Sequence, residues 1–412
     1  MASPAGSQSQ TSPVNRTVQL RIDVPLLIII AILLIFGLLM VYSASFDPAL
    51  RIKGDPYYIF RRQLLFMLSG VLIAGVIAFM DYHIWQRLAV PAMAFTILAL
   101  IAVLIIGEYR QGAVRTLLGG SIQPSELAKL VTVVYLAVWL YSKRDNLNNV
   151  SFGLIPMAAI LGLLGGLIYV QPDLSAVVTI IFLGGLMFFL AGGDLKQIGI
   201  ILLVALVAGW LVVRISATGS ERISSYLAGL QDPTQASYHV RRSIEAFVNG
   251  GWLGVGIGKG ETKLTGLPVP HTDSIFAVIG EEIGVIGAIA LIVLFLLLLW
   301  RGLNIAYRAP DGLGALMAAG LTMWITVEAF INMAVMVNLL PFAGNALPFI
   351  SYGGSNLLIS LVAIGIVLNI SRKSVQDKEE SGRLFGAVVN LRWRDRGRRV
   401  SRARRPASHE KS

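Results

Sequence analysis

The chain has 412 residues, of which 55% are hydrophobic and only 14% are charged, with a formal net charge of +11. Together with a mean hydropathy of +0.72, this composition excludes a soluble globular domain of that length. The sequence has no cysteine, which excludes disulfides in the outer loops, thiol chemistry and a thiolate metal site.

Long apolar runs dominate the chain and approach the roughly 20 residues that a helix needs to cross a bilayer. Because no water reaches the hydrocarbon core, each run must satisfy its own backbone polar groups. The predicted fold class is therefore all-α, a polytopic membrane protein with one large extracytoplasmic loop over 215–273. The ten predicted spans are 24–44, 64–80, 88–106, 124–141, 152–170, 175–191, 196–214, 274–299, 313–340 and 348–370.

The two ends of the chain differ in composition from this transmembrane domain, which we place at 21–372. Residues 1–20 are rich in Ser, Gln, Pro and Thr, and residues 373–412 form an Arg-rich polar tail. Both segments are predicted to be disordered. We expect the tail to contact anionic lipid or a partner protein, and not nucleic acid.

Basic residues also indicate the orientation. From Ser371 onward the chain holds 13 of its 34 Lys and Arg residues and five acids. This excess predicts a cytoplasmic C-terminus, and an even number of spans then places the N-terminus in the cytoplasm too. Four basic residues in the first outer loop do not follow the rule: Arg51, Lys53, Arg61 and Arg62.

Polar residues open the fourth span, in the segment 123–129 (Gln-Pro-Ser-Glu-Leu-Ala-Lys). The proline suits a first helical turn, and Ser125 and Glu126 suit its positive dipole end. Lys129 lies three residues after Glu126, so the two side chains can pair on the helix surface. That pairing competes with a functional interpretation, because ionisable groups at membrane depth are costly and usually functional. A second proline–acid element, Gln-Pro-Asp at 171–173, lies between the fifth and sixth spans.

The loop 215–273 is too long for a simple connection, and loops of this length are usually functional or disordered. Its segment 238–247 has the periodicity of a short amphipathic helix, which Gly250-Gly251 would end. A glycine-rich turn, 252–260, then carries Lys259 and is followed by Lys263. Successive backbone amides beside lysines predict a cradle for a phosphate or pyrophosphate. As a nucleotide motif the glycine string is weak, because it neither follows a strand nor opens a clear helix.

The loop ends with His271, Thr272 and Asp273 at the mouth of the eighth span. Asp273 either caps the helix that begins near Ser274 or carries chemistry at the membrane surface. A last segment rich in helix breakers, 347–356, contains Ser351, Tyr352 and a Gly-Gly pair that allows close backbone approach. Helix packing explains each polar segment alone, but their convergence at the outer ends of several spans favours a site.

Four motifs, in this order, resemble those of the SEDS (shape, elongation, division and sporulation) family, which includes FtsW, RodA and SpoVE. They are Gln-Pro-Ser-Glu-Leu-Ala-Lys at 123–129, the Gly-Val-Gly-Ile-Gly region at 254–268, His-Thr-Asp with Gly-Glu-Glu at 271–282, and Pro-Phe-Ile-Ser-Tyr-Gly-Gly-Ser at 348–355. The resemblance covers roughly residues 20–372. The loop 107–122 departs from the family pattern, because the usual Arg-Trp before the first motif is absent.

The resemblance implies a peptidoglycan glycosyltransferase that polymerises lipid II at the outer face of the bacterial cytoplasmic membrane. The implied partners are lipid II and undecaprenyl-linked glycan, a class B penicillin-binding protein and other division proteins. The extended N-terminal segment and the long basic tail favour the division type, at the septum, over an elongation type like RodA. Asp273 matches the catalytic aspartate of the family, and Lys129 matches a lysine of functional importance.

Joining sugars with inversion needs one base, and Asp273 is the predicted general base. The leaving pyrophosphate could be stabilised by Lys129, Arg115, Lys259 or Lys263, or by a divalent cation such as Mg²⁺ or Mn²⁺. No cofactor is established, because the sequence shows no ligand cluster for a metal. The other candidates for substrate binding are Gln123, Ser125, Glu126, His271, Thr272, Ser351 and Tyr352.

Two other functions fit part of this pattern. A lipid II flippase would use the intramembrane charges of Glu126, Lys129, Glu281 and Glu328 along a translocation path. A transporter, however, concentrates its polar groups near the midplane, whereas Asp273 is predicted at the surface. A division scaffold with the basic tail as its docking element is compatible with catalysis.

Overall fold

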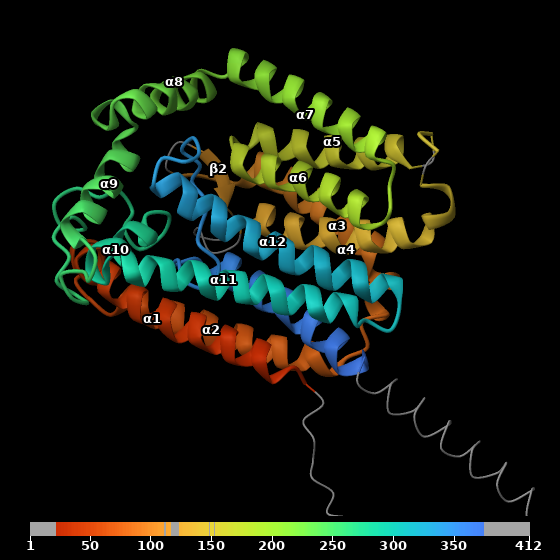
Figure 1. The fold of residues 1–412 in the computed structure, drawn as a ribbon, viewed down its shortest axis with the longest axis horizontal. Helices are drawn as coiled ribbons and strands as arrows, with labels where there is room; N and C mark the ends of the chain where they lie inside the picture. The colour runs from red at the N-terminus through yellow and green to blue at the C-terminus, as the bar shows by residue number, and fades with distance from the viewer. Residues whose placement is uncertain (1–21, 111–112, 117–122, 148, 152, 375–412) are drawn as a thin grey trace, which may run out of the picture.

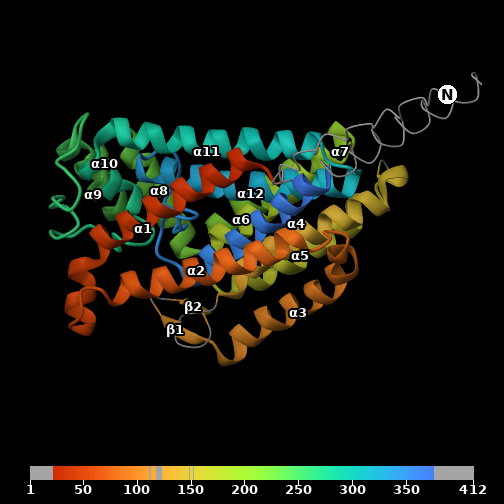
Figure 2. The same ribbon diagram turned by 90° about the horizontal axis from the view of Figure 1, so that it is seen from below.

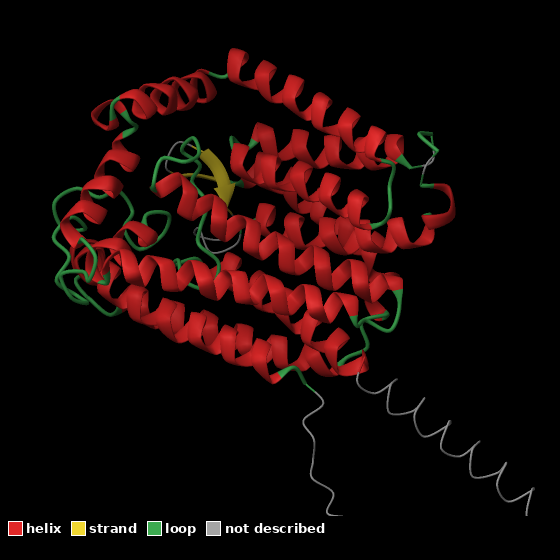
Figure 3. Cartoon of the chain, in the orientation of Figure 1, coloured by secondary structure: helices red, strands yellow, loops and turns green. Residues whose placement is uncertain are grey.

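The computed structural model describes residues 22–374 except 111–112, 117–122, 148 and 152. The predicted disordered segment 1–20 and the tail beyond Ser374 lie outside the described residues, so the proposed division of the chain into three parts stays a prediction. The described chain is almost entirely helical (Figure 3).

Long helices run side by side through the molecule (Figures 1 and 2). Seven of the described helices are long and apolar enough to cross a membrane, and α5 and α6 are shorter apolar helices. This confirms the helical, polytopic fold, while the number of ten spans stays a prediction. The helices in chain order are α1 (Val24–Lys53), α2 (Tyr58–Phe79), α3 (Ile84–Ile106), α4 (Pro124–Ser142), α5 (Leu154–Val170), α6 (Leu174–Leu190), α7 (Leu195–Ile215), α8 (Ala217–Gln231), α9 (Tyr238–Gly250), α10 (Ile275–Glu282), α11 (Gly284–Tyr307), α12 (Gly312–Met336) and a last helix, Gly354–Ser374.

Two differences from the predicted elements affect the type of structure near the candidate site. The predicted eighth span, 274–299, is two helices, because Gly284 takes the left-handed conformation with φ 80° and separates α10 from α11. The loop 107–122 contains a small antiparallel hairpin of β1 (Glu108–Arg110) and β2 (Ala113–Thr116), which was not expected in an all-α chain.

The centre of the bundle is formed by α4, α12 and the last helix, which are the most buried of the candidate spans. α12 packs against α4, α6 and α11. The outer helices instead expose large apolar side chains such as Leu72 of α2 and Ile105 of α3. An apolar exterior of this kind is what a lipid environment requires.

The bundle has two distinct ends. Asp23, just before α1, binds Arg301 of α11 at 2.8 Å, and the Ser374 hydroxyl donates to the Arg308 carbonyl. The first described residues, the turn between α11 and α12, and the end of the last helix therefore share one end, the Arg308 end. The segment 251–274, together with α9 and α10, gathers at the opposite end, called here the Asp273 end (Figures 1 and 3).

A close contact between α1 and the segment before the last helix generates a stability prediction. A Cβ added at Gly37 of α1 would lie 2.4 Å from the Phe349 carbonyl oxygen and 2.7 Å from the Ile350 Cα. Because both atoms belong to backbone, we expect Gly37→Ala to lower the free energy of unfolding by about 1–3 kcal/mol. Thermal unfolding of the purified protein in detergent would measure the change.

Gly75 of α2 is the matched control, because a Cβ there would meet no atom within 4 Å. Replacing a helical glycine by alanine in open space should stabilise the protein by roughly 0.5–1 kcal/mol. Equal unfolding temperatures for the two variants would contradict the proposed contact.

Candidate active site

A buried lysine lies at the start of α4. The Lys129 Nζ is 2.9 Å from a carboxylate oxygen of Glu126 and also pairs with Glu328 of α12. Lys129 and Glu328 are only 4% and 2% exposed, so neither charge could be left without a counter-charge. Asn356 of the last helix donates to Glu126 at 2.9 Å. The predicted Glu126–Lys129 pair is therefore present, within a cluster that joins three helices.

A second polar cluster surrounds the first residues of α4. The Asp173 Oδ2 accepts hydrogen bonds from the Ser125 hydroxyl at 3.1 Å and from the Gln123 amide at 3.3 Å. The Gln123 backbone N–H donates to the Ser355 hydroxyl at 3.0 Å. The proline–acid element at 171–173 thus lies against the 123–129 motif, and the side chain of Asp173 also caps α6 through the Ala176 N–H.

Asp273 directly precedes Ser274, which occupies the N-cap position of α10 and makes no capping hydrogen bond through its side chain. Asp273 is half-buried. Its carboxylate faces backbone: a Cβ added at Gly344 would lie 3.0 Å from the Asp273 Oδ2. The carboxylate therefore lies between the start of α10 and the irregular segment that follows α12.

The segment after residue 347 holds the His-Thr-Asp turn in place. The Ser351 hydroxyl donates to the Thr272 carbonyl at 2.7 Å, and the Tyr352 N–H donates to the His271 carbonyl at 2.8 Å. Gln63 of α2 donates to the Ser351 carbonyl at 3.1 Å. The structure thus brings together four of the predicted site residues, His271, Thr272, Ser351 and Tyr352, through backbone carbonyls.

The glycine-rich turn does not offer a row of free amides. Gly254, Gly256 and Gly258 take positive φ angles of 76°, 106° and 85°. The N–H groups of Val255 and Gly256 donate to the carbonyls of Glu281 and Glu282 at 3.0 and 2.9 Å. The anion cradle predicted for these amides is therefore wrong, because they cap the C-terminal end of α10.

The predicted cations of the glycine-rich region differ in their surroundings. The Lys263 Nζ is 2.5 Å from the Glu282 carboxylate and 2.8 Å from the Ser43 hydroxyl of α1, so it fastens the loop to the bundle. Lys259 is exposed. Arg115 lies in β2, but its side chain is outside the described part of the structure.

Three residues at the site were missed by sequence reasoning: Gln63, Asn332 and Gly344. Gln63 and Asn332 are buried amides on largely apolar membrane helices, which is a signal of function or of tight polar packing. No such signal marks Gly344. Among the described residues, no group of three or more His, Asp or Glu side chains is placed to hold a metal ion.

A family profile described as "cell cycle protein", for FtsW, RodA and SpoVE, matches residues 24–376. The chain belongs to this family. The probable peptidoglycan glycosyltransferase FtsW of Trichlorobacter lovleyi is 42% identical over 356 residues, which cover 85% of this chain and 93% of the relative. Stage V sporulation protein E of Bacillus subtilis is 37% identical over 358 residues, with 85% and 97% covered.

Solved structures support the same assignment. The rod shape determining protein RodA of Thermus thermophilus is 27% identical with a TM-score of 0.65, and the match covers 87% of this chain and 99% of RodA. A chain of a peptidoglycan synthase complex, solved to explain how polymerization and crosslinking are coordinated, is 26% identical with a TM-score of 0.72, over 86% and 99%. These matches confirm the predicted family and enzyme class, a peptidoglycan glycosyltransferase.

The close approach of Gly344 to Asp273 generates a prediction for this enzyme. In Gly344→Ala the new methyl group presses on the Asp273 carboxylate, which must move by a few tenths of an ångström. We expect glycosyltransferase activity to fall roughly tenfold with little change in thermal stability, because Asp273 is the predicted base and small displacements of a reacting group are costly. Gly353→Ala is the control, because its Cβ would meet only the Asn356 Cβ, at 3.6 Å. Equal activity of the two variants would argue against the contact.

His271 generates a pH-dependent prediction. Burial lowers the pKa of His271 from 6.5 to about 4, so the folded protein keeps the ring neutral while the unfolded chain takes up a proton below about pH 6.5. Stability from this group is therefore present above pH 6.5 and is lost as the pH falls toward 4, by at most about 3 kcal/mol. We expect His271→Gln to lose less stability than wild type when thermal unfolding is compared at pH 7.5 and pH 5.

His83, at the Arg308 end, is a control because its pKa is shifted in the opposite direction. Burial alone would lower its pKa, but hydrogen bonds to Asp81 and Asp311 outweigh this and raise it. His83→Gln should therefore lose more stability than wild type on acidification. If both variants followed the wild-type pH dependence, neither histidine would contribute as described.

Proposed function

We propose that this enzyme polymerises lipid II into glycan strands at the outer face of the cytoplasmic membrane during cell division, with Asp273 as general base. The position of Asp273 is the observation that carries the proposal. Its carboxylate is half-buried at the Asp273 end of the bundle and lies against Gly344.

The reaction needs one proton acceptor at this position. The 4-hydroxyl of one sugar attacks the anomeric carbon of the donor, and the bond from that carbon to the pyrophosphate oxygen breaks. Asp273 accepts the hydroxyl proton as the new glycosidic bond forms, and undecaprenyl pyrophosphate leaves with the bonding electrons. A single displacement inverts the anomeric centre and needs no covalent nucleophile.

The burial and pairing of the lysines favour Lys259 as the cation for the departing pyrophosphate. Lys129 is held between two carboxylates, and Lys263 is held by Glu282 and Ser43. The charge of each is already balanced by carboxylates at a fixed position, whereas the exposed Lys259 can follow the leaving group. We keep Arg115 as a second candidate because it belongs to the neighbouring hairpin.

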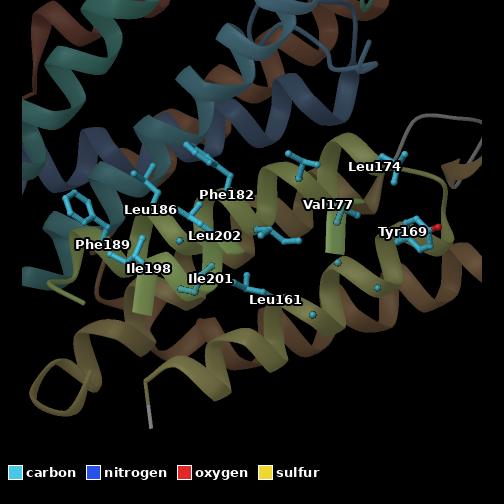
Figure 4. Close-up of a pocket in the computed structure, with 17 residues that line it drawn as sticks. Leu161, Tyr169, Leu174, Val177, Phe182, Leu186, Phe189, Ile198, Ile201 and Leu202 are labelled. Atoms are coloured by element: carbon cyan, nitrogen blue, oxygen red, sulfur yellow. The ribbon is translucent and has the colours of Figure 1, made fainter. Parts of the chain in front are cut away.

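An apolar pocket offers a site for the polyprenyl chain. It has a volume of about 640 Å³ between α5, α6 and α7 and is lined by aliphatic and aromatic side chains and glycines (Figure 4). Tyr169 and Leu174, at one end of the pocket in Figure 4, flank the turn that carries Asp173. A lipid-linked donor could therefore place its tail in this pocket and its headgroup beside the polar start of α4.

Orientation and partners complete the proposal. Both described chain ends lie at the Arg308 end, so we place both termini in the cytoplasm and Asp273 outside, as the basic tail indicates. A class B penicillin-binding protein and other division proteins at the septum are the proposed partners, supported by the likeness to a chain of a peptidoglycan synthase complex. No nucleic acid is involved in this proposal.

The flippase remains the second candidate because of the buried charges of Glu126, Lys129 and Glu328. Their mutual pairing supports a fixed helix contact more than a translocation path, which would need groups that exchange partners with a substrate.

The test is polymerisation of lipid II by the purified protein in liposomes, with and without its cognate penicillin-binding protein. Asp273→Asn should lose roughly 10²–10⁴-fold in rate, because the amide cannot accept the proton. Asp55→Asn, which changes a half-buried carboxylate that pairs with Arg61 in the loop between α1 and α2, should retain wild-type rate.

Two results would contradict the proposal. Wild-type polymerisation by Asp273→Asn would remove the assignment of the base. Transfer of lipid II across the bilayer without glycan synthesis, even with the partner present, would establish the flippase instead.

A further inference from the structure

Asn332 of α12 is a fully buried amide in the last turns of a membrane helix. Its Nδ2 donates to the Asp273 carbonyl at 2.9 Å and to the Asn345 carbonyl at 2.5 Å. Because both partners are carbonyl oxygens, which only accept, the amide nitrogen must point toward them. The two bonds therefore use both hydrogens of one amide group.

The two carbonyls belong to the two sides of the candidate active site. One is the backbone of Asp273 itself. The other belongs to the residue after Gly344, whose backbone faces the Asp273 carboxylate. A single side chain thus fixes the distance between the base and the segment opposite it.

The helix that carries Asn332 is itself firmly placed. Glu328, one turn earlier on the same face of α12, pairs with Lys129 of α4 inside the bundle. Asn332 therefore ties two irregular segments to a rigid, buried helix.

We propose that Asn332 is a positioning residue of the active site, holding Asp273 and the Gly344–Asn345 segment in the geometry that the reaction requires. The proposal rests on the function proposed above, with Asp273 as base. Displacing a reacting group by about 1 Å can cost about 10²-fold in rate, so loss of both hydrogen bonds should act on the rate of reaction and leave substrate binding largely unchanged.

A purely structural amide elsewhere in the chain provides a matched control. Asn369 of the last helix is also buried; its Nδ2 donates to the Ala78 carbonyl at 3.0 Å and its Oδ1 accepts from the Tyr82 N–H at 2.9 Å. These bonds join helices near the Arg308 end, away from Asp273. The Nδ2 also donates to the Met80 carbonyl, so Asn369→Leu removes three hydrogen bonds of a buried amide without touching the site.

The experiment measures kcat and KM for lipid II polymerisation by Asn332→Leu and Asn369→Leu, together with their unfolding temperatures, in the presence of the cognate penicillin-binding protein. We expect Asn332→Leu to lose about 10²-fold in kcat with KM within about twofold of wild type. Asn369→Leu should lose thermal stability but keep its kcat.

A second substitution covers the case in which Asn332→Leu does not fold. Asn332→Ser retains one donor, which can reach only one carbonyl at a time, so its kcat should fall between those of wild type and Asn332→Leu. In the Asp273→Asn background, adding Asn332→Leu should cause no further loss, because there is no base left to position.

Three outcomes would overturn the inference: a kcat for Asn332→Leu or Asn332→Ser equal to wild type, an equal fall in kcat for Asn369→Leu, or a full additional loss in the Asp273→Asn background. The base assignment is separable, because activity retained by Asp273→Asn alone would remove the proposed function. An inactive Asp273→Asn with a fully active Asn332→Leu would remove only the positioning role.

Discussion

The positive charge of Lys129 inside the bundle is the constraint on which the arrangement of the central helices depends. An ammonium group with 4% exposure is stable only where counter-charges meet it inside the protein. Glu126 supplies one from the same helix, and Glu328 supplies the other from α12. Asn356 adds a hydrogen bond from the last helix to Glu126. The three most buried helices are thereby fixed in rotation and depth at one point.

The same requirement for internal partners brings together the residues of the candidate active site. The short segment from Ser351 to Asn356 contacts two motifs that are far apart in the sequence. Its first residue binds the Thr272 carbonyl, while its last two bind the start of α4 at Gln123 and Glu126. Since there is no bulk water in the hydrocarbon region to satisfy these groups, each helix end must be satisfied by another. The hydrogen bonds that position Asp273 are thus part of those that stabilise the fold.

Much of this could be predicted from the sequence, because apolar runs and helix-opening residues are local signals. The helical positions, the Glu126–Lys129 pair and the end of α9 at Gly250 follow from such signals. The long-range partners of such residues cannot be predicted from local signals. Lys129 pairs with Glu328, which is 199 positions away in the sequence, and Lys263 binds Ser43, which is 220 positions away. A single sequence contains nothing that specifies these pairs. The prediction of an uninterrupted eighth span was wrong for another reason. A glycine within an apolar run, such as Gly284, does not indicate by itself that the backbone is left-handed there.

Because the chain breaks at Gly284, α10 is a separate short helix and not the first part of α11. This helix of eight residues is fastened at both ends. At its start, Asn332 and Ser351 bind the carbonyls of Asp273 and Thr272. At its end, Glu281 accepts from the Thr262 N–H and hydroxyl, and Glu282 pairs with Lys263. A short helix held in this way is a rigid support for the residue that precedes it.

Lysines of the same loop have different roles in this arrangement. The glycine-rich turn and Lys263 resemble a phosphate site in sequence, yet their amides and ammonium group bind the C-terminal end of α10 and its carboxylates. Capping that helix end neutralises its exposed carbonyls and the buried charge of Glu282. The loop therefore stabilises the helix that follows Asp273, while Lys259 of the same turn is exposed and is the lysine that we propose for the pyrophosphate.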